Sequence, residues 1–207
     1  IAWHARNLFF RLDTDKPVVR TRLMPSGEGL QIMVYVKDRA ELFSRTMNVL
    51  ARLNFSVLDA RVHTSKTGYA IDTFTVVNPN SASQAYRDVR QLLEHAINEV
   101  LTESTPLAAA QLGKATRQQR HFPIAPTIEI TGDEQGQRFV LEIVAADRTG
   151  LLARIAEVLS SRNVAIQTAR INTLGARAED VFVVSGGRLA EESTRIALET
   201  ELAEAIN

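Results

Sequence analysis

The residues best suited to binding chemistry form an Asp-Arg pair that occurs twice, as Asp38–Arg39 and Asp147–Arg148. Each pair follows a predicted strand and precedes a predicted helix. The first N–H groups of a helix have no intrahelical partners and carry a partial positive charge, so such a turn can hold a carboxylate or a phosphate. The second turn continues with Thr149, Gly150 and Leu151, and Gly150 lacks the Cβ that would keep a ligand away from the backbone. We expect this second turn to bind an anionic group.

The first turn departs from this pattern. Its residues are Asp38, Arg39, Ala40, Glu41 and Leu42, with Glu41 at the position that Gly150 occupies in the second turn. A carboxylate there adds bulk and repels an anionic ligand, although it favours the start of a helix for the same electrostatic reason. The first turn is therefore predicted to be the weaker site or to be purely structural.

Structural roles compete with ligand contact at several positions. Asp38 and Asp147 stand where a helix favours a capping carboxylate, which we interpret as their main role, with ligand contact secondary. Asn54 and Asn163 follow the predicted helices. They either end the helix in a left-handed conformation or present an amide to a ligand across an inter-domain or inter-subunit interface. Leu151 is predicted to be buried in a core or an interface.

The chain shows no recognisable catalytic or metal-binding pattern. Cysteine is absent, which removes disulfides, thiol nucleophiles and Cys-based metal sites together. None of the four histidines stands next to an Asp, or three or four residues from another histidine (His4, His63, His95, His121). Ser44 and Ser160 have no companion base at a recognisable spacing. We expect no catalysis, no metal and no cofactor in this chain.

Composition excludes two further classes of partner. The formal net charge is zero, which argues against an electrostatic grip on nucleic acid or on an anionic membrane. No apolar run approaches the roughly 20 residues that a membrane helix needs, and no signal peptide is recognisable. We therefore expect no nucleic-acid partner, no membrane partner and a cytoplasmic location. The chain begins with Ile rather than Met, so we interpret it as a piece of a longer protein.

The two turns belong to an internal repeat. A shift of 109 residues aligns residues 30–64 with 139–173 without gaps, and ten of these 35 positions are identical. The identical pairs include both residues of the Asp-Arg turn, Asn54 with Asn163, and Arg61 with Arg170. One deletion in the second copy then restores the match of residues 72–76 with 180–184. Two domains of one fold follow from this repeat.

Each copy predicts the same succession of elements. A strand (30–36; 139–145) leads through the Asp-Arg turn into a helix with apolar residues at spacings of three and four. Two strands (55–63 and 69–77; 164–172 and 178–185) and a second helix (82–101; 190–206) follow. A further strand precedes each copy (17–23; 126–131), joined to it by a Gly-containing turn.

This order indicates an α+β fold built from two circularly permuted sandwiches. The ferredoxin-like βαββαβ sandwich carries its fourth strand beside its first, and the leading strand takes that place in a ββαββα order. The hypothesis requires each leading strand to pair within its own copy. We expect residues 1–16 to end an upstream domain, domains at 17–102 and 126–207, and a polar, locally basic and partly mobile linker at 103–125.

Two cross-strand ion pairs are predicted beside the hairpin turns. A turn centred between Lys66 and Thr67 places Arg61 opposite Asp72, and a turn centred at Gly175 places Arg170 opposite Asp180. If exposed, each pair would contribute roughly 0–1 kcal/mol. We favour this structural role over ligand contact.

The pattern of strand, Asp147–Leu152, helix, Asn163 and strand resembles the ACT domain, a small regulatory module that usually binds amino acids. Two such modules in tandem, with Asp72-Thr73-Phe74 in one copy and Glu179–Phe182 in the other, resemble the C-terminal region of the bacterial PII uridylyltransferase/uridylyl-removing enzyme family. The resemblance covers about residues 17–207. Residues 1–16 are similar to the end of the helix that leaves the upstream hydrolytic domain in that family.

The resemblance implies a glutamine sensor. L-Glutamine is the expected ligand, and its binding is expected to control uridylyltransferase and uridylyl-removing activities in upstream catalytic domains of the same chain. Those activities act on the PII signal protein in nitrogen regulation. In the family Mg and UTP belong to the catalytic domains, so none is expected here. A homodimer is a further expectation.

Three other readings compete with the sensor. The tandem could serve only assembly or dimerisation and bind nothing small. RNA-recognition modules share the βαββαβ sandwich, but the central strands here lack the pair of exposed aromatic residues that such modules use. An ACT tandem of an amino-acid biosynthetic enzyme fits the permuted layout and the lead-in from Trp3 to Phe10 less well.

Overall fold

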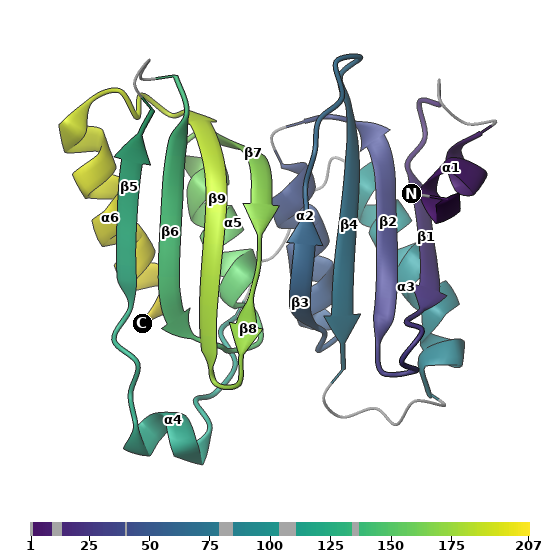
Figure 1. The fold of residues 1–207 in the computed structure, drawn as a ribbon, viewed down its shortest axis with the longest axis horizontal. Coiled ribbons are helices and arrows are strands. Elements are labelled where there is room, and N and C mark those ends of the chain that lie inside the picture. Colours follow the sequence, from purple (N-terminus) through teal and green to yellow (C-terminus); the bar gives the residue numbers. More distant parts are fainter. Residues whose placement is uncertain (1, 10–13, 40, 79–84, 104–110, 134–136) are drawn as a thin grey trace.

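The computed structural model describes residues 2–9, 14–39, 41–78, 85–103, 111–133 and 137–207. It contains two antiparallel sheets, each covered on one face by two helices (Figure 1). We call them unit one and unit two. Unit one comprises β1 (Val18–Leu23), β2 (Leu30–Lys37), α2 (Leu42–Arg52), β3 (Ser56–Arg61), β4 (Tyr69–Val77) and α3 (Ala85–Thr102). Unit two comprises β5 (Thr127–Gly132), β6 (Phe139–Ala146), α5 (Leu151–Ser161), β7 (Val164–Arg170), β8 (Thr173–Leu174), β9 (Arg177–Gly186) and α6 (Glu192–Ile206).

The strand order confirms the permuted sandwich. Unit one has the order β1-β2-β4-β3, and unit two has the order β5-β6-β9-β7 with β8 paired to β9. Each leading strand forms an antiparallel hairpin with the next strand of its own unit, from Leu23 opposite Leu30 in unit one and from Gly132 opposite Phe139 in unit two. This is the place that the last strand holds in the unpermuted βαββαβ sheet.

The first helix of each unit ends as its sequence predicts. Asn54 and Asn163 have φ values of 57° and 55°, the left-handed conformation that terminates a helix. The N–H group of each bonds a carbonyl of the last helical turn, that of Ala51 or Ser160. This reversal leads the chain directly into β3 in unit one and into β7 in unit two. Each of these is an edge strand of its sheet.

The two units pack side by side through equivalent elements. Helix α2 packs against α5, and the edge strand β3 faces β7 and β8 (Figure 1). Asn48 and Glu157, which are equivalent positions of the repeat, meet at 3.4 Å. A residue that meets its own repeat equivalent lies near a pseudo-twofold axis, so the units are related by an approximate twofold rotation at this contact.

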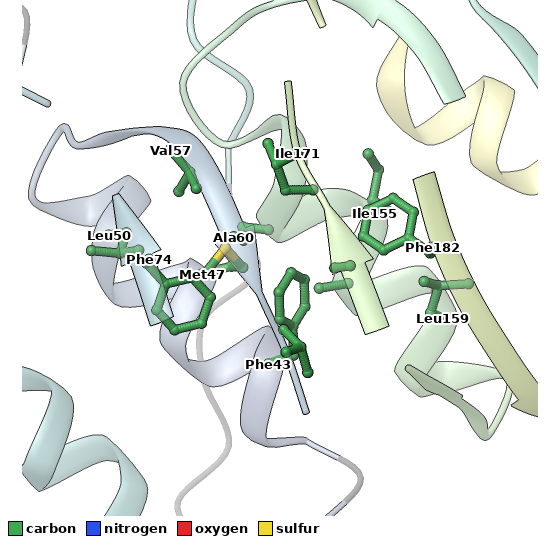
Figure 2. Packing of buried hydrophobic residues seen from close by; sticks show 14 of the residues in the cluster. Phe43, Met47, Leu50, Val57, Ala60, Phe74, Ile155, Leu159, Ile171 and Phe182 are labelled. Carbon is green, nitrogen blue, oxygen red and sulfur yellow. The ribbon is translucent and has the colours of Figure 1, made fainter. Parts of the chain in front are cut away.

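A continuous hydrophobic core joins the units. Phe43 of α2 lies 6.2 Å from Phe74 of its own sheet and 6.3 Å from Phe182 of the other sheet, between ring centroids. Figure 2 shows the side chains of both units meeting around Phe43. Buried residues of α2, α5 and both sheets form one cluster. Because an aromatic residue buries 150–250 Å² or so, this contact contributes substantially to the association of the units.

Helix α1 (Ala2–Leu8) packs on the other face of the first sheet. Leu8 forms a small cluster with Val18, Met33 and Tyr35, whose side chains alternate with the core-facing ones of β1 and β2. His4 bonds the hydroxyl group of Thr73 at 2.8 Å. The segment that leads into unit one is therefore attached to β4.

The predicted cross-strand ion pairs are wrong. Arg61 lies opposite Thr73 rather than Asp72, and Arg170 lies opposite Val181 rather than Asp180. The first hairpin is centred on Thr67, with Thr64 opposite Ala70, and the second has Leu174 opposite Arg177. Each turn is displaced by half a position from its predicted centre, which shifts the register by one residue and turns the two charges to opposite faces. Arg61 instead approaches Asp59 at 3.7 Å.

Candidate functional site

Two cavities lie at the junction of the units, one beside each Asp-Arg turn. Cavity one, of about 180 Å³, is lined by Asp38, Arg39, Leu42, Phe43, Ser44, Val62, Ala70 and Asp72 of unit one and by Ala156, Leu159, Ser160 and Val164–Ile166 of unit two. Cavity two, of about 30 Å³, is lined by Met47, Leu50, Ala51 and Phe55–Val57 of unit one and by Asp147–Ala153, Ile171, Thr173, Ala178 and Asp180 of unit two.

The two cavities are repeat equivalents. Asp38 of cavity one corresponds to Asp147 of cavity two, Asp72 to Asp180, and Leu159 of cavity one to Leu50 of cavity two. The volumes nevertheless differ about sixfold. Cavity one is therefore the roomier of the two.

A buried carboxyl group faces each cavity. Asp72 and Asp180 are each 1% exposed. One oxygen of Asp72 accepts a long hydrogen bond from the backbone N–H of His63 at 3.3 Å. One oxygen of Asp180 likewise accepts a bond from the backbone N–H of Asn172 at 3.4 Å. The other oxygen, Oδ2, has no hydrogen-bond partner among the described residues in either case. Burial, with a smaller contribution from the neighbouring Asp38 or Asp147, raises the pKa of both carboxyls to about 7, although the backbone hydrogen bond acts in the opposite direction.

The capping role predicted for Asp38 and Asp147 is wrong. Helices α2 and α5 begin four residues after these aspartates, and their N-cap residues, Glu41 and Gly150, make no side-chain capping bond. Asp38 Oδ2 instead accepts a hydrogen bond from the hydroxyl of Thr64 at 2.8 Å, tying the turn to the β3–β4 connection. Burial raises the pKa of Asp147. The turn between strand and helix is longer than the sequence pattern indicates.

The arginines of the Asp-Arg turns bind the ends of helices. Arg39 donates to the carbonyl of Leu101 near the end of α3. Arg148 donates to the carbonyls of Ile206 at 2.6 Å and Asn207 at 2.8 Å, at the end of α6. A guanidinium group at a helix C-terminus satisfies carbonyls that lack intrahelical partners and complements the helix dipole. Both arginines thus connect the turn to the second helix of their unit.

The carboxylate of Glu41 is bound to a side chain of the helix that follows it, α2. It accepts hydrogen bonds from the guanidinium of Arg45 at 2.7 and 2.9 Å. An ion pair of this kind offsets the negative charge that was expected to repel an anionic ligand. Leu42 and Leu151, each 3% exposed, belong to the core and also line the cavities. Ala40 lies outside the described residues.

The chain's own linker covers the turn at Gly150. Gly150 has a φ of 86°, and a Cβ built on it would lie 2.4 Å from the carbonyl oxygen of Gln111. The N–H of Gly113 donates to the carbonyl of Thr149 at 2.8 Å, and the side-chain amide of Gln119 donates to the carbonyl of Asp147 at 2.7 Å. The space that the missing Cβ leaves is therefore taken by residues 111–113 and not by free solvent. This arrangement favours cavity one as a ligand site over the second turn.

Asn54 and Asn163 are exposed and line neither cavity. Their left-handed backbone is the helix-terminating role described above.

The burial of Asp72 and Asp180 differs from the exposed ion pairs that the sequence predicts. A signal was present, because Asp72 stands in strict alternation with Ala70, Phe74 and Val76, all of them buried. Alternate residues of a strand face the same side, so this pattern predicts a carboxyl group directed toward the core.

No group of three or more His, Asp or Glu side chains among the described residues is placed to hold a metal ion. No helix of that part of the chain has the length and apolar character to span a membrane.

Comparison with known proteins gives consistent matches. Residues 30–94 match the ACT domain. The whole chain is 47% identical over 210 residues to a bifunctional uridylyltransferase/uridylyl-removing enzyme of Ralstonia nicotianae and 46% identical over 209 residues to that of Cupriavidus pinatubonensis, and it covers 24% of each. The chain thus spans about a quarter of the length of these curated relatives. Among solved structures, an aspartate kinase from Synechocystis matches over 86% of this chain and 26% of that one, with 15% identity and a TM-score of 0.45.

Proposed function

We propose that this chain, an ACT regulatory region similar over its full length to the C-terminal 24% of bifunctional uridylyltransferase/uridylyl-removing enzymes, senses L-glutamine. In this proposal glutamine binds at the junction of the two units and controls the uridylyltransferase and uridylyl-removing activities of upstream catalytic domains. Those domains use Mg and UTP and act on the PII protein.

Cavity one is the observation that supports this proposal most directly. It combines an apolar wall from unit two with polar groups of unit one, among them Asp38, Ser44 and Asp72. Apolar walls with a few placed polar groups are typical of small-molecule sites. The first turn of α2 also lines the cavity, and the N–H groups at a helix start suit an α-carboxylate.

The position of the cavity supports a regulatory role. Residues from both units line it, so a ligand that fits one relative arrangement of the units stabilises that arrangement. Strand β4 contributes Asp72 to the cavity, and its next residue, Thr73, bonds His4 of α1 on the opposite face. A change in β4 would therefore reach the segment that leads into unit one, which is the direction in which the proposed catalytic domains lie.

Calorimetric titration of the 207-residue chain with L-glutamine tests the proposal. We expect saturable binding in the millimolar range, because a metabolite sensor matched to cellular pools needs only about −4 kcal/mol of binding free energy. L-Asparagine, which is one methylene shorter, and L-glutamate, which carries a charge in place of the amide, are the matched ligands and should bind more weakly. Equal binding of all three, or no binding of glutamine, would contradict a glutamine sensor.

Dimerisation is a second candidate function, favoured by the outer face of the second sheet. Val140 and Val181 are 36% and 37% exposed there, on the face turned away from α5 and α6. The corresponding face of the first sheet carries α1. Sedimentation analysis of the chain against a Val140→Lys, Val181→Lys variant would detect a dimer through this face as a loss of the heavier species in the variant.

A further inference from the structure

The unpartnered oxygen of Asp72 is the most unusual group in cavity one. Oδ1 accepts a hydrogen bond from the N–H of His63, but Oδ2, buried with the rest of the side chain, has no hydrogen-bond partner in the part of the chain that the structure describes. A buried polar atom that lacks a partner costs free energy, so such atoms are rare in native structures and often mark a site for a missing group. Here the missing group has space, because the residue lines a cavity of about 180 Å³.

The described residues around the cavity supply no cation for Asp72. Arg39 is the one basic residue among those that line it, and its guanidinium donates to the carbonyl of Leu101. Asp38 adds a second negative charge, and its Oδ2 already accepts the hydroxyl of Thr64. Unit two contributes only apolar residues and Ser160 to the lining. The local excess of negative charge therefore favours a ligand group that is positive and donates hydrogen bonds.

We propose that Asp72 receives the ammonium group of an α-amino acid bound in cavity one. This rests on the proposed amino-acid-sensing function and assigns the residue that recognises the amino end of the ligand. The α-carboxylate then lies toward the first turn of α2, where the N–H groups of the helix start favour negative charge. The zwitterion is thus held by groups of opposite sign at its two ends, and its side chain faces the apolar wall of unit two.

Asp180 provides an internal control for this assignment. It has the same burial and the same unpartnered Oδ2, and it accepts the equivalent bond from the N–H of Asn172. Its cavity holds only about 30 Å³, and the linker at Gln111 packs against the neighbouring Gly150. Cavity one is the roomier of the two, which favours Asp72 over Asp180 as the residue that receives the ligand.

The pH dependence of ligand affinity is a second property by which this proposal can be tested. Burial raises the pKa of Asp72 to about 7, and the charged groups that face it are Asp38 and Arg39 of the preceding turn, with no titratable side chain from unit two among the residues that line the cavity. An ammonium group stabilises the ionised carboxylate, so the affinity for the amino acid should increase as the pH rises from 6 to 8. Replacement of Asp72 by Asn should remove this dependence.

The test combines a protein change with a ligand change. The wild-type chain, Asp72→Asn and Asp180→Asn are titrated by NMR with L-glutamine and with 4-carbamoylbutanoic acid, which is glutamine without its α-amino group. Asn keeps the size of Asp and can still accept the bond from His63, so the fold should be retained. A charge-assisted hydrogen bond predicts that wild type binds glutamine about 10- to 100-fold more tightly than the deamino compound. Asp72→Asn should bind the two compounds within about twofold of each other, and Asp180→Asn should behave as wild type.

The outcomes separate this inference from the proposed function. Retained preference for glutamine over the deamino compound in Asp72→Asn would overturn the role of Asp72 and leave glutamine sensing in place. Loss of that preference in Asp180→Asn, with Asp72→Asn unchanged, would move the site to cavity two and overturn the assignment. No saturable binding of glutamine by the wild-type chain would overturn the proposed function and the inference together.

Discussion

The stability of the chain should depend on pH through Asp72 and Asp180. Burial raises the pKa of each from its ordinary value of 3.8 to about 7. In the unfolded chain both carboxyls return to an ordinary pKa near 3.9 or so. Between these values the folded chain holds protons that the unfolded chain has released, so the free energy of unfolding falls as the pH rises. The proton-linked stability is fully present below about pH 4 and is lost as the pH rises through 7.

The size of the effect follows from the shift in pKa. One pKa unit corresponds to about 1.4 kcal/mol, so a shift of about three units makes each ionised carboxyl cost on the order of 4 kcal/mol above pH 7. Asn has nearly the same shape and no charge. Asp72→Asn and Asp180→Asn should therefore resemble wild type near pH 4 and become more stable than wild type as the pH rises, with the largest difference near pH 8.

Urea unfolding followed by circular dichroism at pH 4, 5, 6, 7 and 8 measures this difference. The quantity of interest is the gap in free energy of unfolding between variant and wild type, because contributions from other titrating groups cancel in it. Asp15→Asn, which alters an exposed carboxyl, is the matched control for the loss of one Asp side chain. A constant gap for Asp72→Asn and Asp180→Asn would refute the reasoning, since it would mean that neither carboxyl titrates near neutrality in the folded chain.

Two further substitutions test the packing between the linker and the units. Gly150→Ala should destabilise the chain by about 1–3 kcal/mol more than Gly175→Ala and should expose the linker to trypsin. Both glycines have positive φ, but of the two only Gly150 would place a Cβ against backbone, 2.4 Å from the Gln111 carbonyl oxygen. Equal losses of stability in the two variants would contradict this prediction. Phe43→Ala should cost about 3–5 kcal/mol and weaken both units in one unfolding transition, because the ring contacts Phe74 and Phe182. A variant in which unit two keeps its wild-type stability would show that the core is not shared.

The elements and their order could be predicted because local patterns determine them. The repeat locates equivalent strands and helices, and the Gly-containing turns before β2 and β6 make each leading strand fold back on its neighbour. Asn54 and Asn163 end their helices as expected, since a left-handed residue at a helix end depends mainly on its own conformational preference. Each of these features involves contacts between residues that are close in the sequence.

The candidate site could be predicted only in part, because its geometry depends on small displacements and on distant contacts. A half-position error in the hairpin centre turned Asp72 and Asp180 from the buried face to the exposed one in the predicted pairing. The turn residues Arg39 and Arg148 bind the ends of helices that lie some sixty residues later. The residues that neighbour an Asp-Arg pair in the sequence do not indicate a hydrogen-bond partner that lies so far along the chain.

The covalent connection of the repeat gives the two cavities unequal surroundings. Two separate copies of one unit, paired about a twofold axis, would form two identical cavities. In a tandem, a single linker joins unit one to unit two, and here Gly113 and Gln119 of this linker bond the backbone of the Asp147–Gly150 turn. The segment before unit one makes no equivalent contact among the described residues, because α1 packs on the outer face of the first sheet. Duplication therefore gives two equivalent turns in unequal surroundings, and the roomier cavity is the one beside Asp72.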